Sequence, residues 1–328
     1  MTSNAKNELL KRLFEADGQP VSGQDIADEF GLSRTAIWKY VKDLEKDGYE
    51  IGTVRKKGYY LITVPDRVNQ ANVKKYLQAT TYGNRIDYME TCESTQLIAH
   101  DEAQSGAPNG TVIISEEQTL GKGRMSRPWN SSAGKGIWMS VIVRPALTPQ
   151  QAPQMTLVAA VAVTRAIQEV TGIEPAIKWP NDILVNGKKV TGILTELQAD
   201  PDRVKAIILG IGINVNQTEE DFPAELKPIA SSLKMVLGHS INRAELIAKT
   251  LEFLEHYTEL YVTHGFSPIK LLWEGYSNTA GRRIRAVMFN ETIEGTALGI
   301  SNEGMLELKL DDGTVRGIFS ADIEFEKQ

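Results

Sequence analysis

Nine consecutive residues in the middle of the chain combine backbone flexibility, positive charge and an aromatic ring. The stretch Gly121–Trp129 contains two glycines, one indole and the three cations Lys122, Arg124 and Arg127. Glycines let backbone N–H groups turn toward an anion, and lysine and arginine add charge to hold it. The indole offers a face on which a planar base can stack. A solvated surface turn has a similar composition, so this stretch alone leaves nucleotide binding open.

Three further stretches gather polar side chains. Glu93–Gln96 places two hydroxyls beside an amide, and Gly210–Asn216 ends an apolar run on two asparagines. Lys178–Asp182 is followed by a turn, Asn186–Lys189, which carries two more cations. Each stretch also has a purely structural interpretation, because the hydroxyls can lie at a strand edge and the aspartate can form a turn.

Other classes of site are excluded by what the sequence lacks. There is no GxxxxGK sequence followed by Ser or Thr, and Gly210–Asn214 lacks the third glycine of a dinucleotide fingerprint. The four histidines lack metal-ligand spacing with Cys92 or with one another. The lone cysteine rules out an internal disulfide and fits a reducing compartment. The net charge of −6 means that any contact with nucleic acid must be local.

Alternating strand-like and helical runs must position these side chains. Three runs rich in β-branched residues predict strands at 111–115, 136–143 and 204–215. Two apolar runs with helical spacing predict helices at 150–170 and 243–261. The longest apolar run, Met155–Val163, is interrupted by Arg165 and is too short to cross a membrane. The N-terminus lacks a secretory apolar core. We therefore expect a cytoplasmic protein with a mixed α/β domain over residues 65–277.

Residues 1–64 predict three helices and a hairpin. Apolar residues recur at helical spacing from Leu9 to Phe14, and Ser22 and Ser33 can cap the next two helices. Two strands follow, 49–54 and 59–64. Three helices and a hairpin are typical of a winged helix-turn-helix. A linker over 64–73 then leads into the next domain.

Positive charge is concentrated on the third helix and on the hairpin tip. Residues 1–33 contain three Lys or Arg and six Asp or Glu, whereas residues 34–57 contain seven and four. Phosphates would meet this surface, so it predicts DNA binding. The expected DNA-binding residues are Ser33, Arg34, Thr35, Trp38, Lys39 and Lys42 on the helix and Arg55, Lys56 and Lys57 on the wing. A winged helix used for protein contacts, with solvating lysines, is the alternative.

The last part of the chain changes to short strands with turn residues. Four runs of strand-forming residues, 283–287, 291–299, 305–310 and 315–319, are predicted here, with turns at 302–304 and 311–313. Residues 278–328 therefore predict a small SH3-like β-barrel, whose own function the sequence does not indicate.

The motifs together resemble the biotin–protein ligases. ESTQ, EEQTLGKGRMSRPW, KWPNDIL with GKKVTGIL, and GIGINVN occur in the family's order and spacing. The preceding winged helix is similar to that of the bifunctional members, the biotin operon repressors. The resemblance implies a three-domain α+β protein with a class II synthetase-like core. It also implies ATP, Mg²⁺ and biotin as ligands, with biotinyl-5′-AMP as intermediate and corepressor. The implied partners are a biotin carboxyl carrier protein of acetyl-CoA carboxylase, operator DNA and a second copy of the chain.

The resemblance also implies roles for individual residues. For biotin these are Ser94, Thr95, Gln96 and Gln118 at the ureido ring and Lys122, Gly123, Arg124 and Lys189 along the carboxylate path. For ATP they are Arg124, Arg127 and Lys189 at the phosphates, Trp129 over the adenine and Asn214 at its edge. The implied catalytic residues are Lys189, Arg124 and Asp182, the last as a base for the acceptor lysine.

This sequence departs from the family pattern at three positions. Gln96 stands where many relatives have Asn, and Lys122 and Ser126 replace an Arg and a Gly of the loop. Two other functions remain open: a transcription factor that only senses biotin, and a lipoyl or octanoyl ligase of related fold. The intact cations argue against the first, and the pairing of KWPND with GKGR argues against the second.

Overall fold

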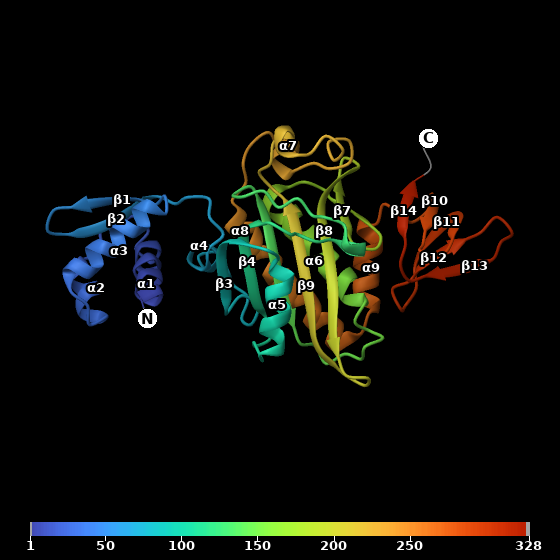
Figure 1. Cartoon of the computed structure of the whole chain (residues 1–328), viewed down its shortest axis with the longest axis horizontal. Helices are drawn as coiled ribbons and strands as arrows, with labels where there is room; N and C mark the ends of the chain where they lie inside the picture. Colours follow the sequence, from blue (N-terminus) through green and yellow to red (C-terminus); the bar gives the residue numbers. More distant parts are fainter. Residues whose placement is uncertain (1, 326–328) are drawn as a thin grey trace. The chain divides into compact units, whose positions relative to one another are not determined.

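The computed structural model describes residues 2–325, and the chain divides into two compact units between Lys75 and Tyr76. The first unit contains α1 (Thr2–Glu15), α2 (Gly23–Glu29), α3 (Arg34–Lys46), the hairpin β1 (Glu50–Val54) and β2 (Gly58–Thr63), and α4 (Gln70–Lys74) (Figure 1). The hydroxyls of Ser22 and Ser33 each accept an N–H from the first turn of the following helix at 3.2 Å. The winged helix-turn-helix expected from the sequence is therefore confirmed.

Apolar residues from all three helices form the core of this unit. Those fully enclosed include Leu9, Leu13, Ile26, Ile37 and Leu44. Because Ile37, Val41 and Leu44 are buried, the opposite side of α3 faces solvent.

The segment expected to be a linker is bound to the first unit. Tyr49 donates its hydroxyl to Asn72 Oδ1 at 2.7 Å, and the Asn72 amide donates to the Pro65 and Arg67 carbonyls. Asn69 caps the short helix α4 within this segment.

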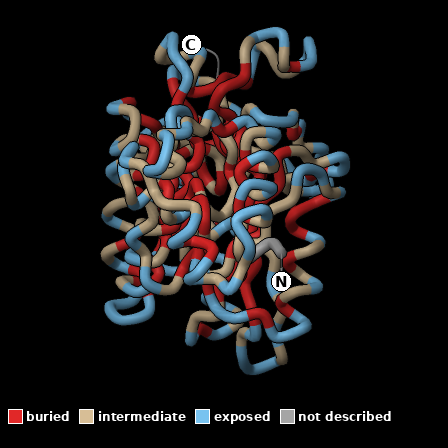
Figure 2. Tube along the Cα trace, turned by 90° about the vertical axis from the view of Figure 1, so that its left-hand side faces the viewer, coloured by how far each residue is buried: buried red, intermediate tan, exposed pale blue. Residues whose placement is uncertain are grey.

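The second unit is built on a seven-stranded sheet with the order β3-β4-β5-β9-β8-β7-β6 (Figure 1). Its strands are β3 (Ile86–Cys92), β4 (Thr111–Gln118), β5 (Gly136–Val143), β6 (Ala176–Lys178), β7 (Asp182–Val185), β8 (Lys188–Ala199) and β9 (Val204–Asn214). Strands β3 and β4 pair in parallel, and the other neighbours pair antiparallel. The strands predicted at 111–115, 136–143 and 204–215 are confirmed. Figure 2 shows the buried segments in the interior of the molecule and the exposed ones outside them.

Helices cover both faces of this sheet. Ser140, Gly210 and Leu194 lie side by side across β5, β9 and β8, and Ser140 hydrogen-bonds to α5 (Thr95–Gln104). Thr195, the next residue on β8, points to the other face and hydrogen-bonds to Thr156 of α6 (Gln154–Thr171).

The helices on the α6 side form a layer of their own. Helix α6 packs with α8 (Arg243–His264) and α9 (Ser267–Tyr276), and a short helix α7 (Leu233–Leu237) lies in the connection before α8. The predicted helices at 150–170 and 243–261 are thereby confirmed. Within residues 2–325 no helix is long and apolar enough to cross a membrane.

A five-stranded antiparallel sheet completes the second unit. Its order is β13-β12-β11-β10-β14, formed by β10 (Arg283–Val287), β11 (Thr292–Ile300), β12 (Leu306–Lys309), β13 (Val315–Ile318) and β14 (Asp322–Phe325). The sequence predicted the first four of these strands. Strand β14 was not predicted, and it pairs with β10 at the edge of the sheet.

Candidate active site and DNA-binding surface

A cavity of about 710 Å³ lies on the α5 side of the seven-stranded sheet. Its lining includes every ligase residue that the sequence predicted: Ser94, Thr95, Gln96, Gln118, Lys122, Gly123, Arg124, Arg127, Trp129, Asp182, Lys189 and Asn214. Residues 321–325 of the C-terminal sheet also line it. The fold thus brings four separate sequence motifs to one place.

The N-terminus of α5 forms a hydrogen-bonded polar end of the cavity. Ser94 caps the helix, and its hydroxyl accepts the Gln96 N–H at 3.3 Å. The Thr95 N–H and hydroxyl both donate to Gln118 Oε1, at 2.8 and 3.1 Å. Gln118 in turn donates to the Ser131 hydroxyl at 2.9 Å. The hydroxyls of Ser94 and Thr95 therefore begin a helix and are held in place, which rejects the strand-edge interpretation.

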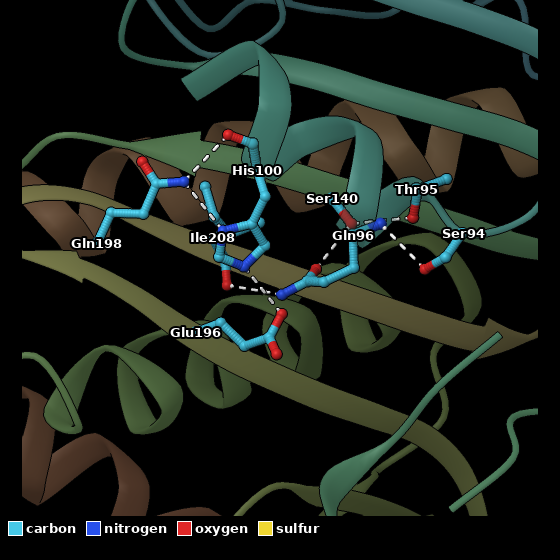
Figure 3. Close-up of polar contacts among 8 residues, drawn as sticks. All are labelled: Ser94, Thr95, Gln96, His100, Ser140, Glu196, Gln198 and Ile208. Carbon is cyan, nitrogen blue, oxygen red and sulfur yellow. Dashed lines mark hydrogen bonds and ion pairs between the residues drawn. The ribbon is translucent and has the colours of Figure 1, made fainter. Parts of the chain in front are cut away.

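Gln96 lines the cavity with its amide already engaged by the sheet. Its Nε2 donates to the Ile208 carbonyl at 3.2 Å, and its Oε1 accepts from the Ser140 hydroxyl at 2.9 Å (Figure 3). A Cβ added at Gly210 would lie 2.6 Å from this Oε1, so the glycine makes room for the amide. These contacts anchor the start of α5 to β5 and β9.

A second group of lining residues combines the cations of the predicted site with the carboxylates of Asp182, Asp322 and Glu324. Lys189 Nζ lies 2.6 Å from Asp182 Oδ1 and 5.2 Å from the centroid of the Trp129 ring. Arg124 donates to Asn181 Oδ1 at 3.0 Å. Burial lowers the pKa of the Arg124 guanidinium, as the loss of water disfavours the charged form. This concentration of positive charge suits a polyanionic ligand.

Two residues of the KWPND stretch join this group although neither was predicted individually. Asn181 also donates to the Ile193 carbonyl at 2.9 Å, so it fixes Arg124 to the β8 backbone. Lys178 pairs across the strands with Asp182, and burial lowers the pKa of its ammonium group. Both positions stood inside a motif that the sequence singled out.

Trp129 lies across a pair of glycines in the sheet. Gly192 on β8 and Gly212 on β9 are direct cross-strand partners. A Cβ at Gly212 would lie 2.6 Å from the indole, and one at Gly192 would lie 2.8 Å from it. Side chains at these two positions would therefore displace the ring. Asn214, at the end of β9, accepts from Gln217 Nε2 at 3.3 Å.

The loop formed by Gly121–Trp129, called the Gly-rich loop below, is bonded to the C-terminal part of the second unit. Arg124 Nη2 donates to the Ser320 hydroxyl at 2.6 Å, and Arg127 forms an ion pair with Asp322 of β14. Gly123 donates its N–H to the Arg127 carbonyl at 2.8 Å. Ser126 has a φ of +57°, a conformation that favours glycine, so the serine stands in strained backbone at this point of the loop. The sequence did not predict the contacts of β14 with the loop.

The predicted DNA-binding residues lie on the surface of the first unit. Thr35, Lys39 and Lys42 are exposed on α3, and Arg55, Lys56 and Lys57 are exposed between β1 and β2. Arg34, at the start of α3, is exposed as well. Ser33 uses its hydroxyl to cap the helix, and Lys42 Nζ forms an ion pair with Glu45 at 2.5 Å.

In the part of the chain that the structure describes, no three histidine, cysteine or carboxylate side chains lie together so that they could hold a metal ion. His100 instead bonds to Glu196 and Gln198 on β8 (Figure 3).

Comparisons with known proteins identify the same three parts. Residues 88–214 match the biotin/lipoate A/B protein ligase family, residues 6–60 match an HTH domain, and residues 279–326 match the biotin protein ligase C-terminal domain. The bifunctional ligase/repressor BirA of Bacillus subtilis is 48% identical over 99% of both chains. The protein of the same name from Escherichia coli is 27% identical over 90% of both chains.

A solved structure is similar in fold to three quarters of this chain. It is the biotin protein ligase from Aquifex aeolicus in complex with biotin and ATP, with a TM-score of 0.64 and 28% identity. The match covers 75% of this chain and 100% of that one. With all three parts matched in order and 48% identity over nearly the whole length, this chain belongs to the family of bifunctional ligase/repressors named BirA.

Proposed function

We propose that this protein is an ATP-dependent biotin–protein ligase and a transcriptional repressor. As a ligase it would form biotinyl-5′-AMP and transfer the biotinyl group to a lysine of the biotin carboxyl carrier protein of acetyl-CoA carboxylase. The observation that carries this proposal is the convergence of four motifs on one cavity, which is lined by a hydrogen-bonded polar group and by a group of cations.

The two groups of side chains match the two substrates. The hydroxyls and amide of Ser94, Thr95 and Gln118 offer donors and acceptors for the ureido ring of biotin. Joining the biotin carboxylate to ATP brings two anions together and expels pyrophosphate, and fixed positive charge stabilises both events. Lys189 and Arg124 supply that charge in the role we assign to them.

The remaining residues would complete the ATP site and the transfer step. Trp129 would cover the adenine, Asn214 would bond to its edge, and Arg127 would contact the triphosphate. Mg²⁺ would enter bound to the phosphates, as small hard cations do with nucleotide substrates. Asp182 would accept the proton of the acceptor lysine. Lys122 and Gly123 belong to the loop that we expect to close over the water-sensitive anhydride.

The first unit would bind operator DNA. Its exposed basic helix and wing suit phosphate contacts, and two copies related by a twofold axis would contact two half-sites. We propose that biotinyl-AMP favours the dimer and so acts as corepressor. We further propose that the protein works in the cytoplasm, where its carrier-protein and DNA partners would be found.

Labelled biotin with ATP and a purified carrier domain tests the ligase proposal. We expect ATP-dependent transfer of labelled biotin to the carrier. Labelled lipoate or octanoate, used in place of biotin, should not be transferred. The matched family also includes lipoate ligases, so transfer of lipoate in place of biotin would support that second function. Biotin binding without any transfer would instead indicate a sensor. A mobility-shift assay with duplex DNA tests the repressor half separately.

A further inference from the structure

One tryptophan lies outside any core. Trp138, Trp179 and Trp273 are at most 2% exposed, and Trp129 lines the cavity. Trp38, on α3, is 50% exposed. Among residues 2–325 its indole makes no hydrogen bond, ring contact or cation–π contact. Half of this large apolar side chain is therefore open to solvent, and its indole N–H has no partner among the described residues.

The neighbours of Trp38 make one continuous exposed face of α3. Thr35 precedes it by about one helical turn, and Lys42 follows it by another. These residues and Lys39 are exposed, whereas Ile37 on the other side is fully buried. The face thus combines one large apolar group, one methyl-bearing hydroxyl and positive charge.

Acidic residues neutralise the positive charge in the last turns of α3 but not in its first half. In the last turns of α3, Lys42 pairs with Glu45 and Lys46 pairs with Asp43. No acidic residue within residues 2–325 pairs with Arg34 or Lys39. The unneutralised charge is therefore in the first half of the helix, on either side of Trp38, where a recognition helix contacts bases.

We propose that Trp38 contacts the C5-methyl group of a thymine in the major groove of operator DNA. This inference rests on the proposed DNA-binding function and adds a specificity-determining residue to it. Arg34 and Lys39 position the helix on the phosphates, and Trp38 distinguishes the base.

The chemistry of the groove selects this base. Thymine alone presents a methyl group there, whereas the other three bases present only hydrogen-bond donors and acceptors. Indole carbons against those groups would leave them unpaired and out of water, which is unfavourable. A methyl group against the ring instead buries apolar surface.

The probe is a DNA duplex selected from a randomised pool by the full-length protein with biotin and ATP present. Each thymine of the selected sequence is then replaced by deoxyuridine, which removes only the methyl group. For the wild-type protein we expect one such replacement in each half-site to weaken binding about fourfold, equivalent to roughly 0.8 kcal/mol per buried methyl group.

Three variants separate this role from general effects. Trp38→Ala should bind more weakly and should no longer distinguish thymine from deoxyuridine at that position. Lys39→Ala should weaken binding yet retain the distinction, since we assign it to a phosphate. Ile62→Ala removes another exposed apolar side chain of the same unit and should change neither property. Biotin transfer should be normal in all three, because none lines the ligase cavity.

Two failures are distinguishable. If Trp38→Ala still discriminates thymine from deoxyuridine as the wild type does, Trp38 does not read the methyl group and this inference is refuted alone. If the wild-type protein enriches no duplex while it still ligates biotin, the proposed DNA-binding function fails, and the inference fails with it.

Discussion

Replacing Gly212 with alanine tests whether the glycine pair supports the Trp129 ring at the ATP site. The added Cβ would lie 2.6 Å from the indole, about 0.8 Å closer than the 3.4 Å at which ordinary contact begins. Gly192 and β8 close the sheet below the ring, so the ring must move outward into the cavity. Crowding of this size costs about 1–3 kcal/mol. If the adenine binds against Trp129, KM for ATP should rise roughly five- to hundredfold.

Biotin-dependent exchange of pyrophosphate into ATP measures this effect without the carrier protein. The thermal unfolding midpoint should fall by less than this crowding alone would cause, because alanine also restricts the unfolded chain relative to glycine. Trp129→Ala provides the control: with the ring removed, adding Gly212→Ala should cause no further loss. A wild-type KM for ATP in Gly212→Ala, or an undiminished loss in the Trp129→Ala background, would refute this account of the site.

Four further predictions concern charge and assembly. Lys189→Met should slow biotinyl-AMP formation by roughly ten- to a hundredfold, which corresponds to the loss of a charge-assisted contact. Lys188→Met should not slow it, because that ammonium bonds to the Lys227 carbonyl. Equal rates in both variants would show that Lys189 does not act in the site. Asp322→Asn breaks the ion pair that holds the loop, so limited proteolysis of the loop should quicken and KM for ATP should change, and an unaltered cleavage rate would show that the pair does not restrain it. Lys39→Ala should make the log–log salt dependence of DNA binding shallower by about 0.9, and Lys42→Ala by less, because Glu45 already neutralises that lysine; a reversed order would contradict the ion pairing seen here. Biotinyl-AMP should shift the monomer–dimer equilibrium toward the dimer in analytical ultracentrifugation. An unchanged dimer dissociation constant together with unchanged DNA affinity would disprove the corepressor mechanism.

Much of the fold was predictable because local patterns and tertiary packing agree. The serine caps at Ser22 and Ser33 mark helix starts in the sequence and make the expected hydrogen bonds in the structure. The apolar run from Met155 belongs to a helix buried between the sheet and α8, so hydropathy alone indicated its place. Where a segment buries a regular apolar face, the pattern is sufficient.

The contacts of the C-terminal strand could not be read in the same way. Strand β14 is defined by its pairing with β10, from which three other strands separate it along the chain. Nothing in the sequence relates Ser320 to Arg124, which lies nearly two hundred residues earlier. Gln96 illustrates a second limit: the resemblance implied a contact with biotin, but no pattern in the sequence indicated that its Oε1 and Nε2 also bond to the sheet, where Gly210 leaves space for them.

The arginines of the loop connect two parts of the second unit that the sequence treats as separate domains. Arg127 pairs with Asp322, and both residues line the cavity. A carboxylate and a phosphate compete for the same donors of a guanidinium group, so an arginine that turns to a triphosphate must release its aspartate. Binding of ATP would then be coupled to the contact between the loop and the C-terminal sheet. That coupling gives the small sheet a physical part in the reaction: it holds the loop cations near the cavity until a more highly charged anion replaces its own carboxylate.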